Sequence, residues 1–215
     1  SGPQIQYGGI SMSADPASFD GDDDDFLPDA DGMPYLNIFS LPTAAETGGV
    51  ASGTEQYYSV NYGNVHIVSL DSQVSARDPD QRASMKQWLE DDLASNGRDW
   101  TVVIFHHPPY SMGANHDSDT ADTGNVGIDR PQWDMRNEFT PVFEEYGVDV
   151  VYSGHSHSYE RSYYLRGSRA KSTANDPLLY AELDAARQPA LGREEPYEQL
   201  SPTSGGLDDR VVYTV

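Results

Sequence analysis

Four histidines stand directly after apolar segments of this sequence, in positions suited to binding a metal ion. They are His106 and His107 after residues 100–105, and His155 and His157 after residues 148–152. Histidines at positions i and i+2 of an extended segment project to the same side, so His155 and His157 can face one metal ion or two neighbouring ions. Imidazole nitrogen suits zinc and iron, and the chain has no cysteine that could supply a thiolate instead.

The segments that carry these histidines read as buried strands of a sheet. Residues 100–105 form a continuous apolar run, which is typical of a strand covered on both faces, and Pro108 and Pro109 end it. Residues 148–152 predict a second buried strand, and residues 211–215 predict a third. Open α/β sheets bind ligands at the carboxyl ends of their strands, so we expect the two histidine pairs to meet at one edge of the sheet.

Other elements alternate with these strands. Residues 57–70 alternate in polarity around a turn at Gly63-Asn64, which predicts a β-hairpin in which His66 is structural or exposed. Apolar spacing predicts a helix over residues 81–95. A second helix around residues 139–146 should begin or kink near Thr140, because Pro141 follows. This order of strands and helices predicts a layered α/β fold.

Composition excludes several classes of protein. The 35 acidic and 13 basic residues give a net charge of −22, which disfavours nucleic acid as a partner because phosphate binding needs a basic face. No apolar run approaches the roughly 20 residues that span a bilayer, so no membrane segment is expected. The absence of cysteine excludes disulfides. A length of 215 residues fits one domain.

Two polar segments flank the central part of the chain. Residues 11–42 predict an acidic surface loop, and residues 167–209 predict an insertion or loop with one short helical piece near residues 178–187. The aspartates at positions 20, 22 and 24 alternate as in a calcium loop. An EF-hand loop needs a glycine after the third acidic position, but Asp25 and Phe26 follow here, so a solvated loop is favoured.

Three segments carry a resemblance to a known family. They are His106-His107-Pro108-Pro109-Tyr110, then His116, and above all Gly154-His155-Ser156-His157-Ser158-Tyr159-Glu160-Arg161. These segments resemble the C-terminal half of the catalytic domain of calcineurin-like metallophosphoesterases, specifically the purple acid phosphatase branch. The resemblance covers residues 57–166 best and implies one partial catalytic domain over residues 1–215. It further implies a four-layer α/β/β/α sandwich that hydrolyses phosphate monoesters with a metal-bound hydroxide.

The resemblance also implies roles for individual residues. It implies a two-metal centre of iron with zinc, manganese or a second iron, in which His106 and His155 bind one ion and His157 binds the other. His116 resembles the histidine that contacts the phosphate or protonates the leaving alkoxide. Plant members often carry a second histidine beside it, but Asn115 stands there in this chain, so the acid function would rest on His116 alone.

The remaining motif residues have two open interpretations. His107 would point away from His106 in an extended backbone, which favours a supporting role over metal binding. Tyr159, Glu160 and Arg161 either contact the substrate or brace their loop. Bracing is favoured because metal sites depend on groups that orient the ligands.

The family motifs D-x-H and G-N-H do not occur in these 215 residues. We therefore expect the chain to be part of a longer catalytic domain, to bind at most one divalent ion alone, and to need a complementary N-terminal segment or to self-associate. One alternative is a catalytically inactive half-domain or acidic binding module that needs a partner chain. Another is a mononuclear zinc hydrolase with His106, His155 and His157 as ligands. The resemblance implies a small phosphate ester as substrate and a secreted or periplasmic location.

Overall fold

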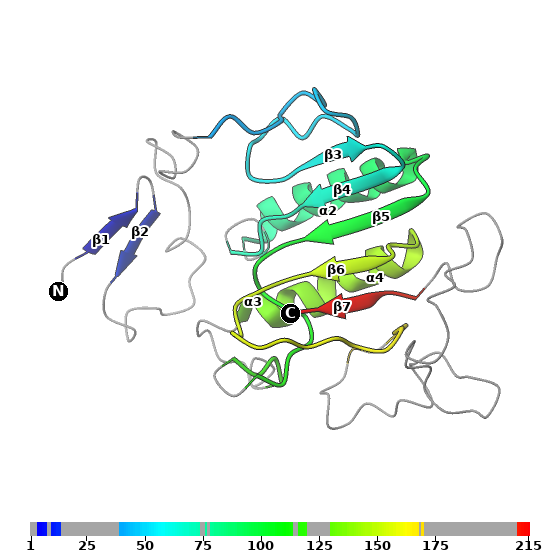
Figure 1. Ribbon diagram of the computed structural model, residues 1–215. Coiled ribbons are helices and arrows are strands. Elements are labelled where there is room, and N and C mark those ends of the chain that lie inside the picture. The colour runs from blue at the N-terminus through cyan, green and yellow to red at the C-terminus, as the bar shows by residue number, and fades with distance from the viewer. Residues whose placement is uncertain are drawn as a thin grey trace, which may run out of the picture.

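A computed structural model describes residues 39–73, 76, 78–113, 116–119, 130–167, 169 and 210–215, together with the backbone of residues 4–7 and 10–13 (Figure 1). In chain order the elements are β1 (Gln4–Tyr7), β2 (Ile10–Ser13), β3 (Tyr58–Tyr62), β4 (Val65–Ser69), α2 (Pro79–Ser95), β5 (Trp100–Ile104), α3 (Arg130–Asp134), the π-helix η4 (Met135–Phe139), α4 (Thr140–Glu145), β6 (Val150–Tyr152) and β7 (Val212–Thr214). Within these residues, no helix combines the length and apolar composition that a membrane span requires.

Five strands form the main sheet in the order β3-β4-β5-β6-β7. The predicted hairpin is confirmed as the antiparallel pair β3 and β4, and β4, β5, β6 and β7 pair in parallel. One row of paired residues crosses the sheet and is buried throughout: Ser59, Val68, Val103, Val151 and Tyr213. The predicted α/β class is therefore confirmed.

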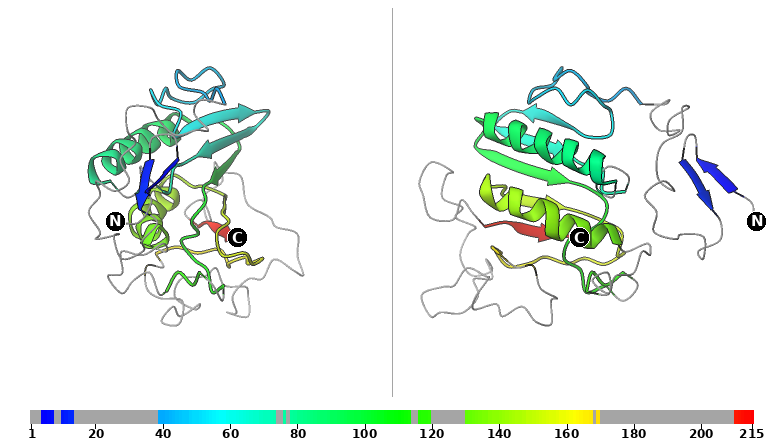
Figure 2. Two further views of the ribbon diagram at one scale, coloured as in Figure 1. Left: turned by 90° about the vertical axis from the view of Figure 1, so that its left-hand side faces the viewer. Right: turned by 180° about the vertical axis from the view of Figure 1, so that it is seen from behind.

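Both helical segments lie on one face of this sheet (Figure 2). Helix α2 buries Met85, Leu89 and Leu93, and the second helical segment buries Phe139 and Phe143. These side chains belong to the same hydrophobic core as the buried valines of β4, β5 and β6. The core therefore fills the space between the sheet and a single layer of helices.

The opposite face of the sheet is open in the described residues, which corrects the prediction of strands covered on both faces. Trp100 and Ile104 of β5 are 41% and 37% exposed, and Tyr152 of β6 is 53% exposed. Ile104 and Tyr152 are register partners, so they form one apolar patch. Because strand side chains alternate, only every second residue of these strands reaches the core.

Helix α2 begins two residues before its predicted start, at Pro79. The side chain of Asp78 accepts a hydrogen bond from the backbone N–H of Gln81 at 2.7 Å and caps the helix. Proline is well suited to the first turn because it has no N–H to leave unpaired there. The helix ends at Ser95, as predicted, and Asn96 is its C-terminal cap.

The second helical segment is longer than predicted and changes its hydrogen bonding midway. It starts at Arg130 as α3, continues as η4 and restarts at Thr140 as α4, which confirms the predicted boundary at that residue. The N–H of Thr140 donates to the carbonyl of Met135, five residues back. Pro141 has no N–H to donate, so the regular α-helical ladder cannot continue unchanged through this point.

His66 is structural, as one of its two predicted alternatives states. Its ring is 1% exposed and lies 2.8 Å from Asp92 through Nε2 and 2.8 Å from Asn61 through Nδ1. Asp92 is fully buried and also accepts hydrogen bonds from the Ser59 hydroxyl and from the N–H of Val50. This network joins β3, β4 and α2 to the loop that precedes β3.

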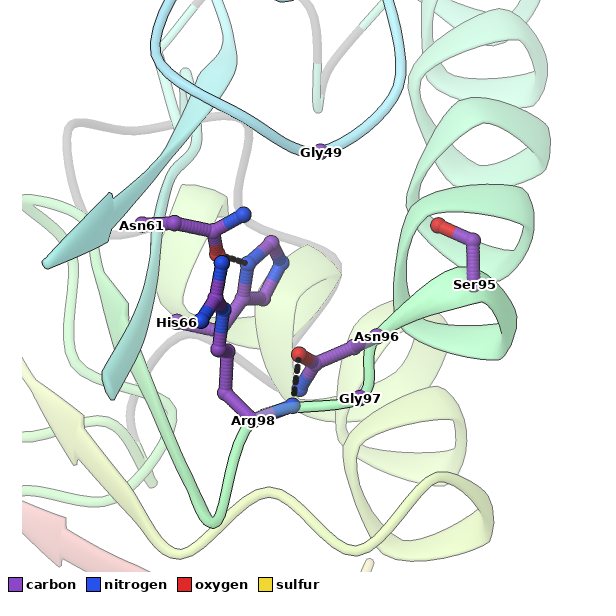
Figure 3. A pocket seen from close by; sticks show the side chains of 7 residues that line it. All are labelled: Gly49, Asn61, His66, Ser95, Asn96, Gly97 and Arg98. Carbon is purple, nitrogen blue, oxygen red and sulfur yellow. Dashed lines mark hydrogen bonds between the residues drawn. The ribbon is translucent and has the colours of Figure 1, made fainter. Parts of the chain in front are cut away.

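A pocket of about 270 Å³ opens beside this network (Figure 3). Gly49 lies across it from Asn61 and His66, and the end of α2 forms another wall. Gly49 has φ +76°, and a Cβ atom there would meet Ser59 Oγ at 1.9 Å and Asp92 Oδ1 at 2.5 Å. Only glycine therefore fits where the loop approaches the buried carboxylate.

We predict that Gly49→Ala lowers the free energy of unfolding by roughly 3 kcal/mol, because it adds left-handed strain to a steric clash with the network. Denaturant unfolding followed by circular dichroism measures the change. Gly53→Ala is the matched control, since Gly53 also has positive φ, +72°, but has open space around its Cβ position. An equal loss in both variants would contradict the packing argument and leave only backbone strain.

Candidate metal centre

The predicted histidines meet at the carboxyl ends of β5 and β6. The chain leaves β5 at Phe105 and leaves β6 at Ser153, and the two exits are hydrogen bonded to each other. Phe105 N donates to Tyr152 O at 3.1 Å, and Gly154 N donates to His106 O at 3.0 Å. Two segments 49 residues apart in the sequence thus run side by side at this edge.

The backbone at His155 and His157 is unusual. Their φ angles are +67° and +55°, and among the described residues Ala45 is the other non-glycine residue with positive φ. The extended conformation predicted for this segment is therefore wrong, and the two rings need not project to one side. Left-handed backbone costs non-glycine residues free energy and recurs at functional sites, where the surrounding structure holds it in place.

Three histidine rings, those of His106, His107 and His116, lie around His155, which is buried. Nδ1 of His155 lies 3.3 Å from Nε2 of His106. Its ring centroid lies 4.5 Å from that of His107 and 4.1 Å from that of His116. His157 is exposed, and its ring centroid lies 6.2 Å from that of His116.

Three of these side chains form a set compact enough for one ion. Each of His106, His107 and His155 offers a ring nitrogen within 4.8 Å of the others. The set contains His107, for which a supporting role is predicted, and does not contain the predicted ligand His157. The chain bends at residues 106 and 107. The alternation of an extended strand therefore does not apply to them, and the His107 ring lies beside the others.

His107 has a polar partner that the sequence analysis did not single out. Its Nδ1 lies 2.8 Å from the hydroxyl of Ser72, and its backbone N–H donates to the same hydroxyl at 3.1 Å. Ser72 follows the end of β4, so a third strand end contributes to the site. The sequence feature that could have identified Ser72 is its position directly after an apolar strand. A bond at Nδ1 fixes the ring orientation and leaves Nε2 as the nitrogen facing the site.

The electrostatics of the cluster suit metal binding. Burial lowers the pKa of the His106 ring below its ordinary value, and the nearby rings of His116 and His157 lower it further. A lower pKa keeps more of the imidazole neutral at a given pH, and the neutral form is the one that binds metals. Beside His106 a cavity of about 390 Å³ opens along Ile104, Tyr152 and Gly154.

Glu160 links the segment after His157 to the connection that follows β5. Its carboxylate accepts hydrogen bonds from the hydroxyls of Ser158 at 2.6 Å and Ser111 at 2.8 Å, and from the N–H of Met112 at 2.8 Å. Burial alone would raise the pKa of Glu160, but these hydrogen bonds outweigh it and lower the pKa. The ionised carboxylate thus joins the loop of His157 to the loop that leads to His116.

Tyr159 and Arg161 lie on either side of that anchor. Tyr159 is 86% exposed. The backbone of Arg161 forms an antiparallel bridge with Thr214, the last residue of β7. In the same strip Glu160 and Val215 exchange backbone hydrogen bonds at 3.2 Å and 3.0 Å. The histidine loop is therefore fixed to the sheet through its backbone.

Comparison with known proteins identifies the family. A family model described as calcineurin-like phosphoesterase matches residues 13–159. The chain belongs to the calcineurin-like phosphoesterase family. This confirms the predicted resemblance.

Curated relatives include purple acid phosphatases. Purple acid phosphatase 18 of Arabidopsis thaliana is 29% identical over 154 residues, which are 70% of this chain and 31% of that protein. Phosphoenolpyruvate phosphatase of Allium cepa is 30% identical over 133 residues, 60% of this chain and 24% of that protein. An uncharacterized protein of Mycobacterium tuberculosis is 30% identical over 151 residues, 65% of this chain and 26% of that protein. The chain thus spans between a quarter and a third of the length of these relatives.

Among solved structures, a purple acid phosphatase from yellow lupin (Lupinus luteus) seeds is similar, with a TM-score of 0.44 and 21% sequence identity. The similarity covers 65% of this chain and 22% of that one.

The donor atoms at the strand ends fit a transition-metal ion. Three imidazoles within 4.8 Å of one another match the ligand chemistry of zinc and iron sites better than that of calcium, which takes oxygen ligands. The same group contains no carboxylate among the described residues. These residues by themselves therefore provide imidazole ligands for one ion and no oxygen atom to bridge two.

We predict that His155→Ala lowers the metal content of the protein, because His155 lies at the centre of the imidazole cluster. His157→Ala should do the same if His157 binds an ion, as the family resemblance implies. Elemental analysis after dialysis measures zinc and manganese per chain. His66→Gln is the control, since it removes a buried histidine from the separate network with Asp92. Unchanged metal stoichiometry in both site variants would refute the ligand assignment.

Proposed function

We propose that this protein contributes the histidine half of a metal-dependent phosphoesterase site that hydrolyses phosphate monoesters. The observation that carries the proposal is the convergence of His106, His155 and His116 at the carboxyl ends of β5 and β6 in a chain of the calcineurin-like phosphoesterase family. The purple acid phosphatases among its relatives support a small phosphate ester as the substrate.

In this proposal His106 and His155 hold one divalent ion and His157 faces a second. The family resemblance favours iron with zinc, manganese or another iron. An ion held there would supply Lewis-acid polarisation of the phosphoryl oxygens and would lower the pKa of a water molecule. Burial lowers the pKa of His106 and so favours its neutral form, and the Ser72 hydroxyl orients the His107 ring.

His116 is the proposed general acid. Its ring centroid lies 4.1 Å from that of His155, so its side chain faces the cluster from a separate loop. From there its imidazolium can donate a hydrogen bond to a phosphoryl oxygen or a proton to the leaving alkoxide. Such a donor acts on charge that develops in the transition state.

One specific observation keeps the mononuclear zinc alternative open. His106, His107 and His155 already form a three-imidazole set, and three histidines with a water molecule are a known catalytic zinc arrangement. It differs from the sequence-based alternative because His107 replaces His157. The two-metal proposal is preferred because the family resemblance implies it, and the metal stoichiometry of the His157 variant separates the two.

The open face of the sheet bears on partners. Trp100, Ile104 and Tyr152 lie exposed on the side away from the helices, and the cavity beside His106 opens along Ile104 and Tyr152. We propose that a complementary segment, of the kind the four-layer family arrangement implies, packs against this face. Residues from it would approach the cavity beside His106. A secreted or periplasmic location also remains a proposal from the family resemblance.

We predict that His116→Ala reduces turnover by about 10²–10⁴-fold, the usual contribution of a general acid, while metal content stays unchanged. The loss should be smaller for nitrophenyl phosphate than for an alkyl phosphate, because nitrophenolate leaves without protonation. Steady-state kinetics with both esters, in protein expressed from its complete open reading frame, measure this. Equal losses for the two esters would contradict the acid role.

We predict that residues 1–215 expressed alone bind at most one zinc or manganese ion, show little phosphatase activity and associate through the open sheet face. Exposed apolar patches of this kind favour association. Elemental analysis, nitrophenyl phosphate hydrolysis and light scattering test the three parts. Two tightly bound ions with turnover of about 1 s⁻¹ or faster, the lower end of typical enzyme rates, would show that this chain supplies a complete site.

A further inference from the structure

Arg136 is the largest fully buried side chain among the described residues, and it lies beside the metal centre rather than in it. It belongs to η4 and is 1% exposed. Burying a guanidinium is costly unless hydrogen bonds and an opposite charge compensate. The groups that compensate it therefore indicate what this arginine does.

Those groups come from two parts of the connection between β5 and α3, which carries His106, His107 and His116. Nε of Arg136 donates to the carbonyl of Pro109 at 2.6 Å, in the loop that begins with His106. Its Nη2 donates to the Ser118 hydroxyl and its Nη1 lies 3.4 Å from Asp119 Oδ1, in the loop that contains His116. The guanidinium carbon also lies 4.9 Å from the ring centroid of Tyr110.

The Ser118 contact stabilises the closure of the His116 loop. Ser111 N donates to Ser118 Oγ at 2.9 Å, and Ser118 N donates to Ser111 O at 3.0 Å. Ser111 is also a partner of Glu160, so the loop is tied to the segment after His157 as well. His116 lies two residues before Ser118 in the same segment. A shift of the Ser118 position that Arg136 fixes would therefore also move His116.

The π-helical turn determines where Arg136 points. The N–H of Thr140 bonds to Met135 across five residues, and the Thr140 hydroxyl donates to the carbonyl of Arg136 at 2.6 Å. Gln132, one turn earlier, donates to the carbonyl of His116 at 3.4 Å. Single π-turns inside helices are frequent at functional sites because the extra residue redirects side chains. Here the redirected side chain faces the histidine loops.

We propose that Arg136 is a positioning residue that holds the His116 imidazole against His155 by joining the part of the β5–α3 connection at Pro109 to the part at Ser118. The expected effect on turnover rests on the proposed function, whereas the positioning of the His116 ring by Arg136 does not. Lysine cannot replace Arg136. A single ammonium group lacks the planar set of N–H donors that reaches both Pro109 and Ser118, and it cannot stack on the Tyr110 ring at the same time.

The test compares Arg136→Lys with the wild type, both expressed from the complete open reading frame. We expect turnover of an alkyl phosphate to fall about 10²-fold, the scale of a misplaced catalytic group. Turnover of nitrophenyl phosphate should fall much less, and metal content should stay unchanged. The ratio of the two rates does not depend on how much protein is folded, so simple destabilisation leaves it constant.

Asp92→Asn is the matched control. It disturbs another buried charged network, that of His66, which lies in the amino-terminal part of β4 rather than at the strand ends that carry the site. Its ratio of alkyl to nitrophenyl phosphate turnover should equal that of the wild type. The proposal would be overturned if Asp92→Asn changed the ratio of alkyl to nitrophenyl phosphate turnover as much as Arg136→Lys does.

A second readout needs no activity. In protein with ¹³C,¹⁵N-labelled histidine, the His116 ring resonance, assigned by its loss in His116→Ala, should move in Arg136→Lys and not in Asp92→Asn. If the wild type hydrolyses neither ester, the proposed function fails and this shift still decides the role of Arg136. An unmoved resonance overturns the proposal.

Where Arg136→Lys does not fold, Ser118→Ala takes its place, because it removes one acceptor of Arg136 and the Ser111 contact. It should move the His116 resonance in the same way, and an unmoved resonance again overturns the proposal.

Discussion

Parallel pairing between β5 and β6 is the interaction on which the site depends. Val103 pairs with Val151, and from this pair the chain reaches His106 three residues later and His155 four residues later. The hydrogen bond from Gly154 N to His106 O extends the pairing beyond both strands. A shift of one residue in this register would turn the buried valines outward and separate the two imidazoles. Core packing and site geometry are therefore fixed by the same contact.

Around this contact the loops are held from three sides. Glu160 ties the His157 loop to the His116 loop, Ser72 orients His107 from the end of β4, and Arg136 supports the Pro109 and Ser118 loops from the helical layer. These three groups can support the site without contacting a substrate. At the same site His155 and His157 have left-handed backbone, which neither residue would favour in an isolated peptide.

Much of the fold follows from local sequence patterns. The hairpin, α2, the strand over residues 100–104 and the helix boundary at Thr140 come from alternation, capping residues and proline, all of which act over a few residues. The meeting of His106 with His155 was also predictable, because strand ends converge in a parallel sheet. The open face of β5 was not predictable from the sequence. An apolar run indicates that both faces of a strand can be buried, but it does not indicate which segment covers each face. The partner of Ser72 lies 35 residues away and those of Arg136 lie 17 to 27 residues away, so no local pattern reveals them.

The central claim is that imidazoles at the ends of β5 and β6 bind a metal ion. X-ray absorption spectroscopy of the zinc-loaded chain, residues 1–215, tests it most directly. The account predicts two or three imidazole nitrogens at about 2.0–2.1 Å from zinc, with the multiple-scattering pattern of histidine rings, and the loss of this pattern in His155→Ala. A spectrum dominated by oxygen ligands, or one that His155→Ala leaves unchanged, would contradict the account.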